Sequence, residues 1–147
     1  MEGKVHVLAR SGSLFAGGQD ELTFRGAGQI EKTEYGHRLR YTAQNELDGS
    51  GVASEIRLEN ARHRAVVITE SQDGGYGLLL DPKAETVTQI AGGDGGALTL
   101  RVQTHEAGWH LPRKGTGRIT LRYTLFLGTQ PMSELHLELT LTKEENN

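Results

Sequence analysis

The sequence contains no cysteine, which excludes a disulfide scaffold, a thiolate metal site and a cysteine nucleophile. An excess of positive charge is absent too: 16 basic and 19 acidic residues give a net charge of −3, so nothing indicates nucleic-acid binding. No apolar run approaches the roughly 20 residues that cross a bilayer. The first residues, Met1–Lys4, lack the apolar segment of a secretory signal. We therefore expect a cytoplasmic protein whose partners are neither membranes nor nucleic acids.

A two-residue hydrophobic period runs along most of the chain and predicts β-strands with one buried face and one wet face. Gaps rich in Gly, Asp and Asn separate the periodic segments, as tight turns require. We predict strands at about residues 4–10, 20–32, 37–47, 53–60, 64–71, 76–81, 86–91, 97–106, 116–128 and 133–143. On the last two strands, four leucines are expected to be buried on one face: Leu121, Leu125, Leu137 and Leu139.

The predicted fold is a single all-β domain over residues 1–147, with residues 143–147 frayed. Ten sequential antiparallel strands hide their edges best by closing into an up-and-down barrel of eight to ten strands. Gly26 and Gly28 lie inside a long predicted strand, where missing side chains permit a bend around a barrel corner. The Gly-rich segment Ser11–Gln19 has room for one helical turn at most.

Three segments carry a resemblance to a known family: Leu22–Gly28, Gly96–Thr104 and Gly117–Tyr123. The first leads through small residues into a polar turn, the second opens with Gly and ends near Thr, and the third opens with Gly and has a late Tyr. Their order resembles the YwiB-like family of small bacterial proteins, over about residues 5–142. The resemblance implies a calycin-like, and so lipocalin-like, β-barrel with no assigned function.

No segment matches a catalytic motif in its required context. The run Gly92–Gly96 resembles a phosphate loop, but a strand pattern follows it where the motif requires a helix, so we interpret it as a hairpin turn. His105, Glu106 and His110 lie close in sequence, beside a connection at Gly108–Lys114, and are a weak alternative metal site. We expect neither an enzyme nor a cofactor.

The inward face of the barrel is the remaining source of functional information. Most inward positions are aliphatic, but five polar residues are predicted to face the lumen and are candidate ligand-binding residues: Tyr41, Asn45, Gln89, Thr104 and Tyr123. An apolar pocket with a few convergent polar groups is typical of a small-molecule site. We therefore expect a small apolar or amphiphilic ligand in the lumen. The alternative is a barrel filled by side chains that acts as a structural or interaction module, through its surface or as a homodimer.

Overall fold

A computed structural model describes residues 1–15, 17–71, 74–91 and 96–144. All ten predicted strands are present. Most begin earlier or end later than predicted, and four stop one or two residues before their predicted C-terminal ends. The ten strands are β1 (Gly3–Phe15), β2 (Gly18–Lys32), β3 (Gly36–Asn45), β4 (Gly51–Glu59), β5 (Arg64–Ser71), β6 (Gly74–Leu80), β7 (Thr86–Ala91), β8 (Ala97–His110), β9 (Thr116–Leu127) and β10 (Gln130–Lys143). No helix in the described part of the chain is long and apolar enough to cross a membrane.

The strands form one antiparallel sheet in the order β6-β5-β4-β3-β2-β1-β10-β9-β8-β7. The first and last strands pair with each other, from Val5 opposite Lys143 to Phe15 opposite Ser133. Every other hydrogen-bonded pair joins strands that are consecutive in sequence. The fold is therefore the predicted all-β, up-and-down barrel, and it is nearly closed.

The seam of this barrel lies between β6 and β7, the two ends of the strand order. Thr86 Oγ1 donates a hydrogen bond to the Leu79 carbonyl oxygen, and Thr88 Oγ1 donates one to the Gly77 carbonyl oxygen, each at 2.5 Å. Side-chain hydroxyls of β7 thus donate hydrogen bonds to carbonyl oxygens of β6. In a paired ladder, backbone N–H groups would donate to these oxygens. The seam is held by side chains instead of by a backbone ladder.

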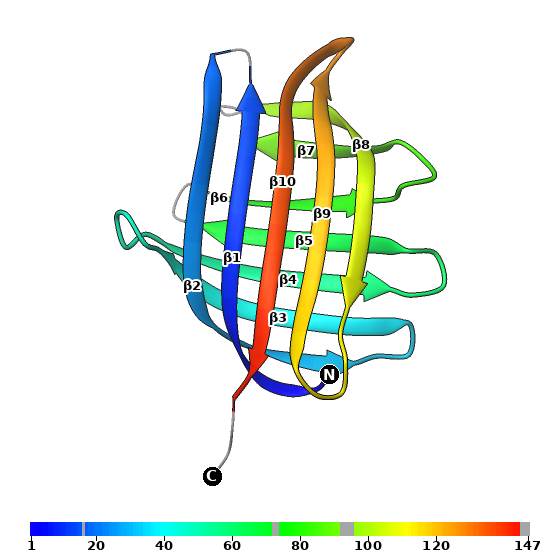
Figure 1. The fold of residues 1–147 in the computed structure, drawn as a ribbon. Helices are drawn as coiled ribbons and strands as arrows, with labels where there is room; N and C mark the ends of the chain where they lie inside the picture. Colours follow the sequence, from blue (N-terminus) through cyan, green and yellow to red (C-terminus); the bar gives the residue numbers. More distant parts are fainter. Residues whose placement is uncertain (16, 72–73, 92–95, 145–147) are drawn as a thin grey trace.

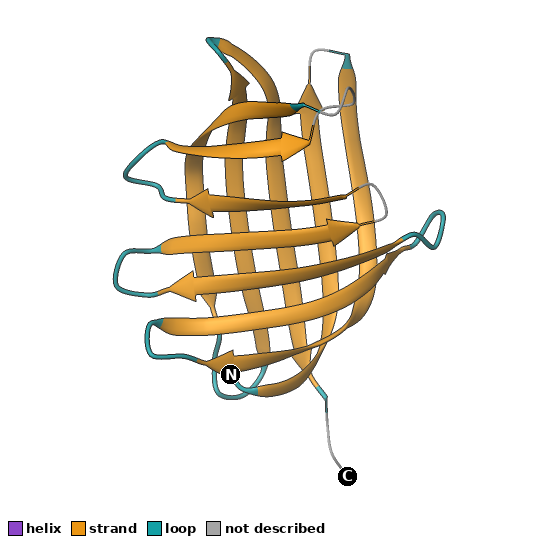
Figure 2. Cartoon of the chain, turned by 180° about the vertical axis from the view of Figure 1, so that it is seen from behind, coloured by secondary structure: helices purple, strands orange, loops and turns teal. Residues whose placement is uncertain are grey.

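The strands lie in two crossing layers (Figure 1). In that view β8, β9, β10, β1 and β2 run vertically in front, and β3 to β7 run horizontally behind; Figure 2 shows the same crossing from behind. Strand β2 belongs to the corner between them, because it pairs with β1 from Gly18 onward but with β3 only from Phe24 onward. At Gly26 and Gly28 a Cβ atom would lie 1.9 Å and 2.2 Å from backbone oxygens of β3. The predicted corner glycines therefore permit this close approach of the two strands.

The core lies between the two layers (Figure 1). Met1 is buried at the end opposite the β1–β2 hairpin, beside Leu111 and Gly117 (Figure 1). The largest fully buried side chains are Ile30, Leu39, Ile56, Leu80, Leu100, Ile119, Leu121, Leu139 and Leu141, with Val5 and Val102. Of the four leucines predicted to share a buried face, Leu121 and Leu139 are fully buried, whereas Leu125 and Leu137 are half-buried and pack against the core.

The segment Ser11–Gln19, expected to hold one helical turn at most, contains none among its described residues, because β1 continues to Phe15 and β2 begins at Gly18. The predicted end of the strand at residues 97–106 is wrong. Strand β8 does not end at residue 106 but runs to His110, so three of the seven residues of the predicted Gly108–Lys114 connection are strand. A bulge between Thr104 and Glu106 shifts the alternation by one residue, which turns Ala107 inward and allows the strand to continue. Most of Gly92–Gly96 lies outside the described residues.

Candidate functional site

Four hydroxyl-bearing residues lie opposite one another across four neighbouring strands of the rear layer. Tyr41 on β3 is the register partner of Ser54 on β4, Ser54 is the partner of Thr69 on β5, and Thr69 is the partner of Tyr76 on β6. Directly paired residues of an antiparallel sheet share a face, and Tyr41 and Ser54 are buried, so this face is the inner one. We call these four residues the hydroxyl row. Within it, the Ser54 and Thr69 hydroxyls form a hydrogen bond of 3.0 Å.

Two further hydroxyls occupy the front layer, which faces the hydroxyl row. Tyr123 on β9 and Thr104 on β8 are register partners, and only 6% and 7% of their surfaces are exposed. The buried Thr104 Oγ1 has no hydrogen-bond partner among the described residues. A buried hydroxyl without a partner costs free energy, and ordered water or a bound molecule normally satisfies it.

A cavity of about 230 Å³ lies between the hydroxyl row and Tyr123, and Thr104 does not line it. Tyr41 and Tyr123 both line it, from opposite layers, as do the other members of the hydroxyl row. The remaining walls are mostly apolar and include Leu22, Phe24, Val52, Val67, Leu135 and Leu137. Leu22 and Tyr76 are 36% and 40% exposed, so the cavity reaches solvent beside them, toward the β1–β2 hairpin.

The electrostatic environment keeps the buried tyrosines protonated. Burial raises the pKa of Tyr41 above its ordinary value, and a hydrogen bond with Ser54 opposes this only in part. Burial also raises the pKa of Tyr123, and the nearby Tyr76 phenol adds to the rise. Because desolvation disfavours the phenolate, both hydroxyls are neutral at physiological pH and can donate hydrogen bonds.

The structure places the other three predicted lumen residues outside this cavity. Thr104 is buried on β8 but is not among the residues that line it. Asn45 is buried, but its Oδ1 accepts a hydrogen bond from the Leu47 backbone N–H at 2.9 Å, so it stabilises the turn after β3. The prediction that Gln89 faces the lumen is wrong. Gln89 is exposed and its neighbour Thr88 is buried, because the inward positions of β7 have the opposite parity.

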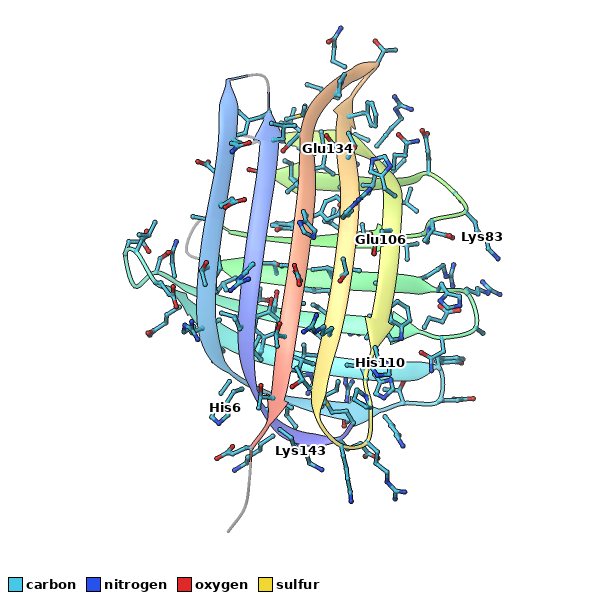
Figure 3. The ribbon with its side chains drawn as sticks, viewed as in Figure 1. His6, Lys83, Glu106, His110, Glu134 and Lys143 are labelled. Atoms are coloured by element: carbon cyan, nitrogen blue, oxygen red, sulfur yellow. The ribbon has the colours of Figure 1, made fainter. Side chains whose placement is uncertain are left out.

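The three residues of the weak metal alternative are all exposed on β8. His105 Nε2 lies 2.7 Å from Thr124 Oγ1, and Glu106 lies 3.8 Å from Arg122. Figure 3 shows Glu106 and His110 at separate points along β8. Over the described residues, no three His, Asp or Glu side chains are grouped to hold a metal ion.

Several hollows are larger than this cavity, and the two with the greatest volumes lie on the outer surface, over β2 to β5. Their volumes are about 640 and 680 Å³, and both include Ala27, Thr42 and Ala53. The first also includes Arg40 and Glu55, which form an ion pair. These hollows are open grooves on a charged, solvent-facing surface. The interior cavity is the better candidate site because its walls are largely desolvated and carry convergent polar groups.

Sequence reasoning found Tyr41 and Tyr123 but missed the rest of the hydroxyl row. Ser54, Thr69 and Tyr76 become neighbours of Tyr41 only through the registers of three hairpins. The alternation of inward and outward residues did carry a signal, since each of the three lies at an inward position of its own predicted strand. Short polar side chains at such positions resemble ordinary strand residues until the register is known.

The comparisons with known proteins agree with this architecture. No curated protein matches the chain. The crystal structure of the YwiB protein from Bacillus subtilis is similar, with a TM-score of 0.75 over 98% of this chain and 94% of that one. Its sequence identity is 19%, so this likeness shows the shared fold alone. Residues 10–139 match the sequence model of DUF1934, a domain of unknown function. The chain therefore belongs to the DUF1934 family and has the YwiB-like fold that its sequence resembles.

Proposed function

We propose that the protein binds a small amphiphilic or apolar molecule in the cavity between its two layers. The observation that carries the proposal is the 230 Å³ cavity whose apolar walls include buried tyrosines from both layers. Barrels of about this size can hold one small ligand, as lipocalins do. Pockets for drug-sized molecules measure about 300–1,000 Å³, so the ligand is smaller than these.

We further propose that the site binds its ligand without converting it. The buried phenols of Tyr41 and Tyr123 have raised pKa values, which suits hydrogen-bond donors better than proton-accepting bases. Binding of this kind requires neither a cofactor nor a metal ion. We place it in the cytoplasm, as the sequence analysis expects, in a protein that is a monomer or a homodimer.

Two measurements test the proposal. The first is mass spectrometry of the small molecules released when the purified protein is denatured. The second is titration with phenol, a small neutral amphiphile, followed by backbone amide chemical shifts. We expect shifts confined to residues around the cavity. Leu22→Trp places a bulky side chain at the mouth and should abolish both signals, whereas Leu47→Trp, at a position that is 84% exposed, should preserve them.

The alternative function is an interaction module whose interior is merely filled. That alternative predicts no released molecule and no phenol-induced shifts, with Leu22→Trp and Leu47→Trp behaving alike. Such a result would overturn the binding proposal. Sedimentation of the purified protein would then show whether the barrel associates with a second copy of itself.

A further inference from the structure

The charge of the cavity walls limits the kind of molecule that can enter. Among the described lining residues there is no Asp, Glu, Lys or Arg, and the one histidine, His136, is exposed on β10. An ion inside this cavity would lose its hydration and gain no opposite charge in exchange. Burial of an unpaired charge is strongly unfavourable, so the walls select against carboxylates and ammonium groups.

The hydrogen-bonding state of the walls indicates what polar group the molecule carries. The Ser54 hydroxyl forms hydrogen bonds with the hydroxyls of both Thr69 and Tyr41. These groups therefore satisfy one another within the hydroxyl row. The Tyr123 hydroxyl, by contrast, has no bond to any described residue. Its register partner Thr104 also has a hydroxyl without a partner, but Thr104 does not line the cavity. The front wall of the cavity therefore presents the Tyr123 hydroxyl, whose O–H needs an acceptor.

The volume of the cavity limits the size of the molecule. A cavity of about 150 Å³ takes benzene. By proportion, the 230 Å³ here takes a molecule of roughly nine non-hydrogen atoms. Phe24, Leu135 and Leu137 give the apolar part of such a molecule a surface to pack against.

We propose that the cavity is selective for an uncharged molecule of this size that carries a hydrogen-bond acceptor, such as a carbonyl oxygen, directed at the Tyr123 hydroxyl. This inference rests on the proposed function and narrows its ligand to one chemical class. The acceptor receives the hydrogen bond from Tyr123, and the apolar remainder lies against the aliphatic walls. Neither part of the molecule meets a charged side chain.

Three probes of nearly identical shape test the selectivity: acetophenone, α-methylstyrene and benzoate. They have the same number of non-hydrogen atoms. Acetophenone has a carbonyl oxygen where α-methylstyrene has a methylene group, and benzoate has a carboxylate in place of the acetyl group. Their dissociation constants are measured at pH 7.5 from amide chemical shifts. One neutral hydrogen bond corresponds to roughly two- to twelvefold in affinity, so acetophenone should bind more tightly than α-methylstyrene by that factor. Benzoate should show no saturable binding.

Substitution of the phenol assigns the selectivity to its residue. In Tyr123→Phe, acetophenone affinity should fall to that of α-methylstyrene, while α-methylstyrene affinity stays unchanged. Tyr35→Phe is the matched control, because Tyr35 is 68% exposed and does not line the cavity, and it should keep the wild-type preference. The α-methylstyrene measurement also reports whether the variant keeps an intact cavity.

The possible outcomes distinguish this inference from the proposed function. Equal binding of acetophenone and α-methylstyrene, or saturable binding of benzoate, would overturn the inference and leave the cavity as a ligand site. A preference that survives Tyr123→Phe would overturn the assignment to that hydroxyl. Failure of phenol and of all three probes to bind would overturn both proposals.

Discussion

The distribution of aliphatic and hydroxyl-bearing side chains on the inner face determines where the interior is packed and where a cavity remains. Most inward side chains are aliphatic and fill the space between the layers, as at Leu139 and Ile119. The hydroxyl row and Tyr123 take the place of aliphatic groups at the inward positions around the cavity. Polar atoms there require partners, so apolar packing alone cannot fill the volume between them.

The orphan hydroxyl of Thr104 gives the first prediction. Thr104→Val removes a buried group that has no partner, so the free energy of unfolding should stay constant or rise by up to about 1 kcal/mol. Thr124→Val is the control, because Thr124 Oγ1 bonds His105 at 2.7 Å, and it should cost about 0.5–1.5 kcal/mol. Urea denaturation measures both. A larger loss for Thr104→Val than for Thr124→Val would mean that ordered water already satisfies the Thr104 hydroxyl.

Glycine at the barrel corner gives the second prediction. In Gly28→Ala the added Cβ would lie 2.2 Å from the Arg40 carbonyl oxygen and 2.6 Å from Tyr41 Cβ. Overpacking of this kind typically costs about 1–3 kcal/mol or more. Gly77→Ala is the matched change within a strand, and its Cβ meets no atom within 4 Å, so its effect should stay near zero. Thermal denaturation of the two variants should differ accordingly; equal midpoints would contradict the close approach of β2 and β3.

At the level of strands, the sequence predicted the elements well and their inward faces less well. The period of two located all ten strands because one face of each strand is buried and the other is wet. It failed where that pattern is interrupted. On β7, Thr88 faces inward and its hydroxyl donates a hydrogen bond to the Gly77 carbonyl oxygen at the seam. A polar residue is therefore buried on this strand, and the alternation of polar and apolar residues wrongly placed Gln89 on the inner face. On β8, one bulged residue shifted the alternation between Thr104 and Glu106.

The same limit applies to the candidate site. Strand parity placed Tyr41 and Tyr123 on the inner face, and they line one cavity. Whether two inward residues meet depends on register and on which strands face each other across the lumen. Sequence periodicity carries neither quantity, so Asn45 was grouped with residues that lie elsewhere.

Strand β10 gives the third prediction, since its inward leucines differ in burial. Leu139 is fully buried, and Leu139→Ala should cost about 2–5 kcal/mol. Leu137 is half-buried and lines the cavity, so Leu137→Ala loses fewer contacts and should cost less than Leu139→Ala. Urea titrations of both variants give the order directly. A larger loss of stability for Leu137→Ala than for Leu139→Ala would contradict the fuller burial of Leu139.

At the level of the whole molecule, stability should depend on pH through His37. Burial, then the N-terminal ammonium group and Lys32, lower the pKa of His37 from its ordinary value of 6.5. Both of its ring nitrogens are buried without a partner among the described residues. The unfolded chain therefore takes up this proton at a higher pH than the folded one. The free energy of unfolding should fall as the pH drops below 6.5 toward the lowered folded-state pKa.

His37→Gln tests this fourth prediction, because it removes the titrating group and should flatten the pH dependence of stability in that window. His6→Gln is the control, since His6 is exposed and lies on the outer surface (Figure 3). Thermal midpoints between pH 7 and pH 5 provide the comparison. The same slope in His37→Gln as in the wild type would assign the acid sensitivity to other groups.

The pairing of β1 with β10 allows the strands to be connected in a different order along the chain without losing any ladder. Among the described strands this pairing is the one ladder that joins distant parts of the sequence, and their seam between β6 and β7 lacks a ladder. A circular permutant that begins at β7, links β10 to β1 through a short Gly/Ser segment and ends at β6 would make every ladder a local hairpin. Its contact order would fall, and folding rates rise as contact order falls. We expect the permutant to refold faster than the natural chain in stopped-flow experiments, and an unchanged rate would mean that the β1–β10 pairing forms after the rate-limiting step.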